Sequence, residues 1–121
     1  MSNTEGEWPT EIRLNPAKDR LHIAFDGGDA FSLPAEFLRV YSPSAEVTGH
    51  GAEERKILGG KQAVTIGAVE PVGNYAVRLR FSDGHSTGIY SWPYLHEVGR
   101  NYETLWRQYL ADLDRLGFRR D

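Results

Sequence analysis

Residues 21–38 read LHIAFDGGDAFSLPAEFL, and this stretch decides the fold class. Apolar residues alternate with polar ones on both sides of the turn at 26–29, a period of two that is typical of β-strands. The Asp-Gly-Gly-Asp sequence favours a tight turn between antiparallel strands. Pro34 then opens PAEFLRV, where a proline in the first turn favours a short helix. The stretch therefore predicts a β-hairpin followed by a helix.

A second stretch repeats this pattern at residues 77–95, VRLRFSDGHSTGIYSWPYL. It again predicts a strand, an Asp-Gly turn, a strand and a helix with an early proline. Few residues are identical between the two stretches, so we interpret them as a repeated ββα unit in structure and not as a proven duplication of sequence. Alternation at 11–14 predicts one more strand, and Val64, Ile66 and Val69 predict another that ends at Pro71.

The C-terminal segment NYETLWRQYLADLDRLGF, residues 101–118, predicts an amphipathic helix. Its apolar residues fall on one face, at positions 105, 106, 109, 110, 113 and 116. Asn101 suits the N-cap, and Gly117 suits the left-handed residue after the helix. We expect the helix to cover a sheet, with Trp106 and Tyr109 in the core. The alternative is an exposed apolar face that pairs two copies of the chain.

These elements fit one domain over residues 1–121, with residues 1–7 expected to be flexible and residues 99–118 forming the C-terminal helix. The predicted fold class is α+β. Antiparallel sheets are built from two ββα-like units, and the amphipathic C-terminal helix packs on the sheet.

Composition removes several classes of function. The chain has no cysteine, which excludes disulfides, thiolate metal sites and a cysteine nucleophile. Its net charge is −3 and its basic residues form no stripe, so we expect no nucleic-acid partner. No apolar run approaches a membrane span, and the acidic N-terminus MSNTEGEWPTE lacks the apolar segment of a signal peptide. We therefore expect a cytoplasmic protein without a membrane partner.

The segment 41–51, YSPSAEVTGHG, holds candidate metal ligands. Glu46 and His50 lie four residues apart, and His85 follows the second hairpin turn, where we expect it partly exposed at a strand end. One carboxylate and two imidazoles make an acceptable ligand set for zinc or ferrous iron. The alternative is that His85 is a turn residue bonded to the local backbone, because the spacing matches no compact metal motif.

No catalytic signature is present in the sequence. The nucleophile elbow G-x-S-x-G and the phosphate loop G-x-x-x-x-G-K-[ST] are both missing. An enzyme within this chain would need a deep pocket lined by Tyr41, Glu46, His50 and Tyr90. We therefore expect a protein that is not an enzyme.

Three motifs together resemble the γ-butyrobetaine-hydroxylase-like N-terminal domain family. They are WPTEIRL at 8–14, LRVYSPSAEVTGHG at 38–51 and VGNYAVRLRFSDGHSTGIYSW at 72–92, and the resemblance spans about residues 8–98. In the carnitine-pathway dioxygenases such a domain is an accessory module beside the iron- and 2-oxoglutarate-dependent catalytic domain, whose facial triad this sequence lacks. Similar domains also stand alone in bacteria or are joined to P-loop ATPases of iron–sulfur assembly.

The resemblance implies a small non-catalytic accessory protein that acts through a protein partner. A partner enzyme and the iron–sulfur assembly machinery are the candidates, and association with further copies of the chain stays open. A partner-binding role predicts an exposed apolar or aromatic patch that includes Trp8 or Trp92.

The resemblance also implies a metal position and a departure from it. Eukaryotic members hold a structural zinc with three cysteines and one histidine, which fall at Ser42, Ser44, Val47 and His85 here. Neutral hydroxyls are poor zinc ligands and valine is none, so this site is not inherited. Two alternatives remain, a different zinc or iron site of Glu46, His50 and His85, and a hydrogen-bonded lock between the 41–51 segment and the second hairpin. The lock is the preferred prediction, so no cofactor is expected apart from that metal.

Overall fold

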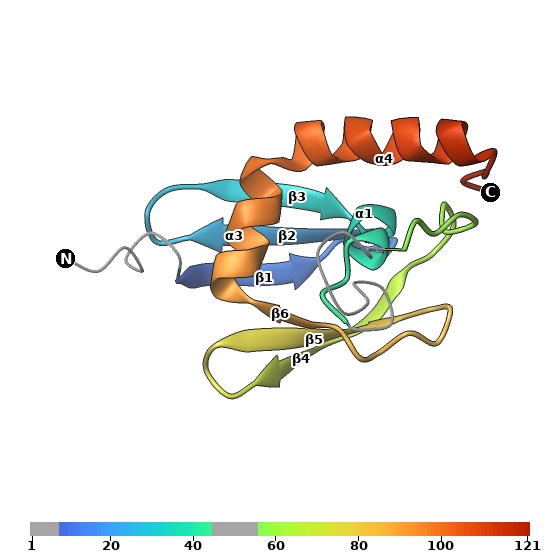
Figure 1. Cartoon of the computed structure of the whole chain (residues 1–121). Coiled ribbons are helices and arrows are strands. Elements are labelled where there is room, and N and C mark those ends of the chain that lie inside the picture. Colours follow the sequence, from blue (N-terminus) through green and yellow to red (C-terminus); the bar gives the residue numbers. More distant parts are fainter. Residues whose placement is uncertain (1–7, 45–55) are drawn as a thin grey trace.

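The computed structural model describes residues 8–44 and 56–121, which form two three-stranded antiparallel sheets and three helices (Figure 1). The first sheet contains β1 (Pro9–Leu14), β2 (Arg20–Phe25) and β3 (Ala30–Pro34), and the second contains β4 (Ile66–Val72), β5 (Ala76–Phe81) and β6 (Ile89–Ser91). The helices are α1 (Ala35–Val40), α3 (Trp92–Arg100) and α4 (Tyr102–Leu116). The predicted α+β class is confirmed. Within the described ranges, no helix is long and apolar enough to cross a membrane.

The structural repeat is confirmed, and one extra strand precedes each ββα unit. β1 pairs with β2 ahead of the first hairpin, and β4 pairs with β5 ahead of the second. The two hairpin turns share one backbone conformation. Gly28 N donates to Phe25 O at 3.0 Å, and Gly84 N donates to Phe81 O at the same distance. Both glycines have positive φ, 104° and 94°, which glycine adopts without strain.

The turn of each hairpin contacts the helix of the other unit. In the first turn, Asp29 Oδ2 lies 2.8 Å from His96 Nε2 on α3. In the second turn, Asp83 Oδ2 accepts a hydrogen bond from Arg39 Nε on α1 at 2.7 Å. The two units are thus held together by polar contacts in both directions, and the end of α1 is brought against the second hairpin.

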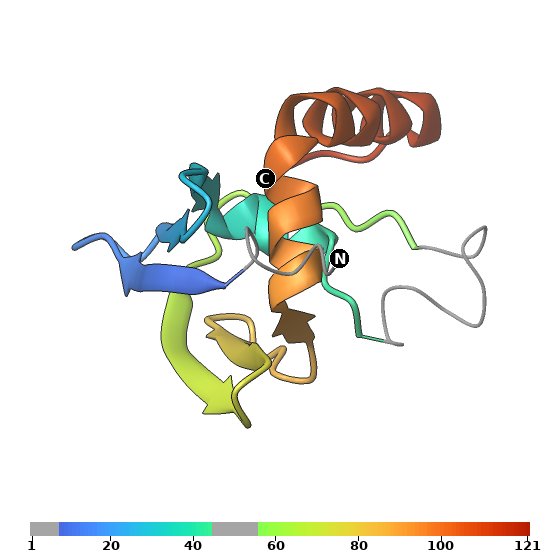
Figure 2. The same ribbon diagram turned by 90° about the vertical axis from the view of Figure 1, so that its left-hand side faces the viewer.

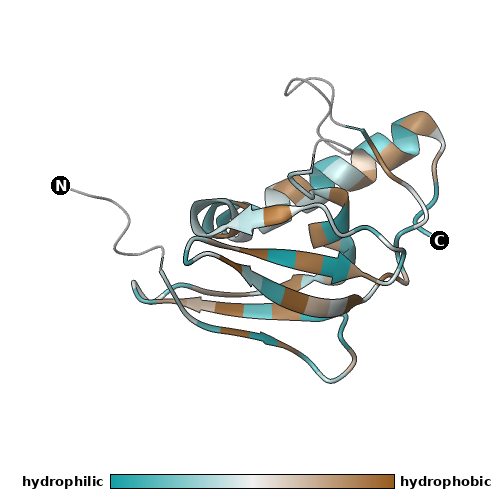
Figure 3. Cartoon of the chain, turned by 90° about the horizontal axis from the view of Figure 1, so that it is seen from below, coloured by the Kyte–Doolittle hydropathy of each residue, from teal (hydrophilic) through white to brown (hydrophobic). Residues whose placement is uncertain are grey.

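The main core lies between the two sheets and α1, with α1 in the middle of the molecule (Figure 2). Apolar and polar residues alternate along the strands, as the hydropathy colours in Figure 3 show. The inward positions of β2 are at most 3% exposed, in agreement with the predicted alternation. Phe37 and Leu38 on α1 are 0% and 1% exposed and complete this core.

The apolar face of helix α4 packs against the end of α1. Tyr109 and Leu113 form a second buried cluster with Val40, against which Ile57 and Leu58 pack. The hydroxyl of Tyr109 donates to Leu58 O, and burial together with the nearby Glu36 carboxylate raises the pKa of that hydroxyl to about 12. The prediction that Tyr109 belongs to the core is confirmed.

The two ends of α4 differ in how well the sequence predicted them. Gly117 has φ 72° and ends the helix in the left-handed conformation, as expected. Asn101 makes no side-chain cap, so that prediction is wrong. Its Nδ2 donates instead to Glu97 O at 2.8 Å, because α3 ends immediately before α4 begins and its last carbonyl groups need donors.

Candidate functional site

His85 lies at the end of the second hairpin turn and is only 7% exposed. The turn is closed by Phe81 N, which donates to His85 O at 2.9 Å. The expectation that this histidine is partly exposed is wrong, because the end of α1 covers it. Its Nε2 lies 2.9 Å from Ser42 Oγ, a contact between residues 43 positions apart. The partner of this ring nitrogen is therefore a side chain of another element and not the local backbone.

Ser42, Ser44, His85 and Thr87 form one group, here called the Ser42–His85 cluster. Ser44 N donates to Ser42 Oγ at 3.3 Å, and the hydroxyls of Ser44 and Thr87 lie 2.7 Å apart. Ser42 is 0% exposed, and Gly88 packs directly on its hydroxyl. The described part of the 41–51 segment is thus fastened to the second hairpin by side-chain hydrogen bonds.

The cluster does not fit the zinc site of the cysteine-containing relatives. Positions 42 and 44 carry neutral hydroxyl groups, and the hydroxyl of Ser42 is bonded to the only imidazole of the cluster. Among residues 8–44 and 56–121, no three His, Cys, Asp or Glu side chains are grouped to hold a metal ion. Glu46, Val47 and His50 lie outside the described residues, so the alternative metal set with His85 stays a prediction.

Asp83 joins the hairpin to two cations beside this cluster. Its Oδ2 accepts hydrogen bonds at 2.7 Å from both Arg39 Nε and Lys61 Nζ, and its Oδ1 accepts one at 3.1 Å from His85 N. Burial opposes the charge, but hydrogen bonds from Lys61, the His85 backbone and Arg39 together lower the pKa of Asp83 to about 2. Arg39 Nη1 is buried without a hydrogen-bond partner among the described residues. This network was not predicted from the sequence, although the Asp-Gly turn marks the position of its carboxylate.

Asp83→Asn is expected to lower the free energy of unfolding by about 1–2 kcal/mol near pH 7. The folded pKa of about 2 lies below the ordinary 3.8, so the stabilisation is complete above the ordinary value and is lost as pH falls toward 2. Urea denaturation near pH 7 and near pH 3 measures this loss. The difference between wild type and variant should shrink at the lower pH. Asp26→Asn, in the exposed turn of the first hairpin, is the control. An equal effect of both variants would refute a stabilising role for the hydrogen bonds that Arg39 and Lys61 donate to Asp83.

The two tyrosines proposed to line an enzyme pocket both donate hydrogen bonds to backbone carbonyl groups. Tyr90 is 0% exposed, and its hydroxyl donates to Leu38 O at 2.5 Å. The hydroxyl of Tyr41 donates to Leu105 O at 2.9 Å. Tyr41 lines a cavity of about 410 Å³ between the end of α1, α3 and α4, and Tyr90 does not take part in it. Both hydroxyls therefore serve the packing of helices.

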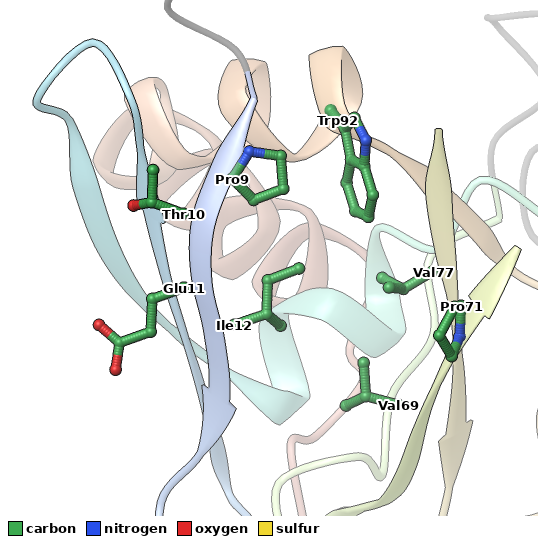
Figure 4. Close-up of a pocket in the computed structure, with 8 residues that line it drawn as sticks. All are labelled: Pro9, Thr10, Glu11, Ile12, Val69, Pro71, Val77 and Trp92. Atoms are coloured by element: carbon green, nitrogen blue, oxygen red, sulfur yellow. The ribbon is translucent and has the colours of Figure 1, made fainter. Parts of the chain in front are cut away.

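A groove of about 460 Å³ separates the edge strands β1 and β4 (Figure 4). Ile12, Val77 and Trp92 point into the groove, whereas Glu11 points away from it (Figure 4). Its lining is mainly apolar and comes from two strands of the second sheet as well as from β1 and α3: Pro9, Thr10, Glu11, Ile12, Val69, Pro71, Val77 and Trp92. We call this site the β1–β4 groove.

The aromatic residues near this groove match one expectation from the sequence. Trp92 Nε1 donates to Asn74 O at 2.9 Å, which holds the indole at the groove wall. Trp8, which directly precedes β1, is 45% exposed, and Tyr75 at the end of the β4–β5 turn is 53% exposed. Trp8, one of the two residues named for the predicted apolar or aromatic patch, is thus exposed, and the patch itself stays a prediction. The groove itself was not predicted, because its walls come from segments far apart in the sequence.

Two solution NMR structures share this fold along nearly the whole chain. Each is described only as the NMR solution structure of the protein, and each is 44% identical to this chain. The first has a TM-score of 0.83 and covers 96% of this chain and 91% of its own. The second has a TM-score of 0.82 and covers 99% of this chain and 89% of its own.

A crystal structure and a family model complete the comparisons. The crystal structure is of a protein of unknown function in the DUF971 family from Acidithiobacillus ferrooxidans, 37% identical with a TM-score of 0.66. The match covers 81% of this chain and 98% of the chain in the crystal structure. No curated protein matches the chain. The family model described as "Gamma-butyrobetaine hydroxylase-like, N-terminal" matches residues 12–96, about seven-tenths of the sequence. The chain therefore belongs to the gamma-butyrobetaine hydroxylase-like N-terminal family.

Proposed function

We propose that this protein is a non-catalytic accessory module that binds a protein partner through the β1–β4 groove. The observation that carries the proposal is the apolar lining of the groove beside two exposed aromatic residues, Trp8 and Tyr75. Apolar surface of this kind marks sites of protein association. The side chains most suited to chemistry support the same conclusion, since Ser42, His85 and Tyr90 are buried in hydrogen bonds that join elements of the fold.

The candidate classes of partner come from the family resemblance and not from the groove. Relatives of this domain are joined to dioxygenases or to P-loop ATPases of iron–sulfur assembly, so a partner enzyme and the iron–sulfur assembly machinery are the candidates.

Affinity capture from a native lysate of the source organism tests the proposal with two variants. Val69→Glu places a charge in the β1–β4 groove, and Ile89→Glu places the same charge on an exposed residue of the same sheet that does not line the groove. A specific partner should be retained by wild type and by Ile89→Glu and lost with Val69→Glu, with thermal unfolding confirming that both variants fold. Equal capture by all three proteins would refute the groove as the binding site.

The metal-binding alternative has its own test on the same preparation. The observation in its favour is the position of His85, which is buried against Ser42 in the same sequence segment that carries Glu46 and His50. Protein purified without an affinity tag should contain about one zinc or iron per chain, lost in His85→Ala, if Glu46, His50 and His85 hold a metal. Metal-free protein that is equally stable with and without chelator would remove this alternative.

A further inference from the structure

We infer that the cavity of about 410 Å³ between the end of α1, α3 and α4 takes an arginine side chain of the partner protein. We call it the α3–α4 cavity. The inference rests on the proposed function for the existence of a partner, and it adds a second point of contact. The cavity lies toward the C-terminal end of α3, whereas Trp92, the first residue of α3, lines the β1–β4 groove.

The junction of α3 with α4 forms the cavity. α3 ends at Arg100 and α4 begins at Tyr102, and the two helices run at a steep angle to each other (Figure 1). Tyr41, at the end of α1, is bonded to both helices. Its hydroxyl donates to Leu105 O at 2.9 Å, and its carbonyl oxygen accepts a hydrogen bond from the hydroxyl of Tyr94. These bonds hold both tyrosine rings at the cavity wall.

The charge at the cavity is that of Glu97. It is the one charged residue among the described residues that line the cavity. Glu97 is exposed, and its carboxylate forms no ion pair or hydrogen bond within residues 8–44 and 56–121. A carboxylate without a partner beside aromatic walls attracts a cation and repels an anion. The occupant that complements this cavity is therefore positively charged.

Neutral acceptors line the cavity together with this carboxylate. Asn101 joins the two helices, and its Nδ2 donates to Glu97 O at 2.8 Å, which leaves its Oδ1 to accept a further hydrogen bond. The hydroxyl of Thr104, in the first turn of α4, forms no hydrogen bond within the described ranges. A guanidinium group suits this set, because it carries several N–H donors in one plane and binds a carboxylate through two of them at once.

The remaining wall distinguishes arginine from lysine. A guanidinium group is planar and weakly hydrated, so it stacks on tyrosine rings with less loss of hydration than an ammonium group suffers. Val98 is 4% exposed and lines the cavity with Leu105, which gives the aliphatic part of the side chain an apolar contact. A purely apolar ligand fits less well, since it would cover the acceptors of Glu97 and Asn101 without supplying donors.

NMR amide spectra of the isotope-labelled full chain test the inference. The probe is Nα-acetyl-L-arginine N-methylamide, an arginine with the ends of a peptide. The matched probe is the same compound built on citrulline, which has the shape of arginine with a neutral urea group. We expect the arginine probe to shift the amide signals of Glu97, Asn101 and Thr104 saturably, with a dissociation constant of about 1 mM. The citrulline probe should bind at least tenfold more weakly.

Two variants test the role of the carboxylate. Glu97→Gln keeps the shape of the side chain and removes its charge, so it should weaken the arginine probe tenfold or more. Glu103→Gln removes the same charge from an exposed position of α4 that does not line the cavity, and it should bind like wild type. Both variants should keep the wild-type spectrum elsewhere, because neither carboxylate forms a bond within the described ranges.

Several results would overturn the inference. They are equal shifts with the citrulline probe, equal binding by Glu97→Gln and Glu103→Gln, and the absence of a saturable shift at ten times the expected dissociation constant. Tighter binding of free L-arginine than of the capped probe would assign the cavity to a small molecule and overturn a partner's side chain as its occupant. None of these results affects groove-dependent capture of a partner from lysate, which decides the proposed function by itself.

Discussion

Replacing Phe37 by alanine is expected to lower the free energy of unfolding by about 3–5 kcal/mol, the largest effect of any single change considered. Phe37 is 0% exposed and lies where α1 meets α4. Its ring centroid lies 4.8 Å from that of Tyr102, 5.2 Å from that of Tyr41 and 6.3 Å from that of Trp106. Truncation would remove all three aromatic contacts and leave a cavity between two elements that other contacts hold in place.

Urea denaturation followed by far-ultraviolet circular dichroism measures this loss. Small domains have total stabilities of about 5–15 kcal/mol, so the variant would fold only marginally near room temperature. Phe118→Ala removes a phenylalanine that is 48% exposed and should change stability by less than about 0.5 kcal/mol. A cost of less than about 1 kcal/mol for Phe37→Ala would show that α1 is not the element that joins α4 to the core.

The elements predicted correctly from the sequence depend on local chemistry. The turns at 26–29 and 82–84 need glycine at positive φ, and Gly28 and Gly84 supply it. Strand alternation and the apolar face of α4 repeat within a few residues, so they are visible before any tertiary contact is known. Both signals state which face of an element is buried. Neither states what covers that face, and the buried residues Tyr109 and Leu113 of α4 pack against Val40 of α1.

The candidate sites were predicted less well because their residues are far apart in the chain. The contact between Ser42 and His85 spans 43 positions, and the burial of His85 depends on where α1 ends. A histidine after a hairpin turn is equally compatible with an exposed and a covered position. Only the family resemblance indicated that positions 42, 44 and 85 meet, and the structure brings these residues into one hydrogen-bonded cluster.

The repeat clarifies what distinguishes the two hairpins. Asp29 and His85 occupy equivalent places after the glycine of their turns, and each contacts the other unit. Asp29 stays exposed and meets His96, whereas His85 is buried against Ser42. The same backbone turn therefore carries a surface contact in one unit and a buried lock in the other.

Arg120→Ala is expected to cost about 2–3 kcal/mol, although the residue lies next to the end of the chain. Its Nε and Nη2 donate to the two carboxylate oxygens of Glu36 at 3.0 and 2.8 Å, and its guanidinium lies 5.4 Å from the Trp106 ring centre. Glu36 is only 6% exposed, so removing the arginine leaves a buried carboxylate without its cation. The exposure of the arginine itself, 40%, keeps the cost below that of a fully buried pair.

Arg119→Ala is the matched control for this prediction. Within residues 8–44 and 56–121, Arg119 forms an ion pair with the exposed Asp121 alone, so its removal should leave stability unchanged. Adding Glu36→Gln to Arg120→Ala should restore part of the loss, since a neutral amide costs less to bury than an unpaired carboxylate. Urea denaturation of the three variants measures both effects. If Arg120→Ala were no more destabilising than Arg119→Ala, the bidentate pair would not hold the C-terminal segment to α1. If the double variant were less stable still, the cost would arise from the lost contact with Trp106 and not from the stranded charge of Glu36.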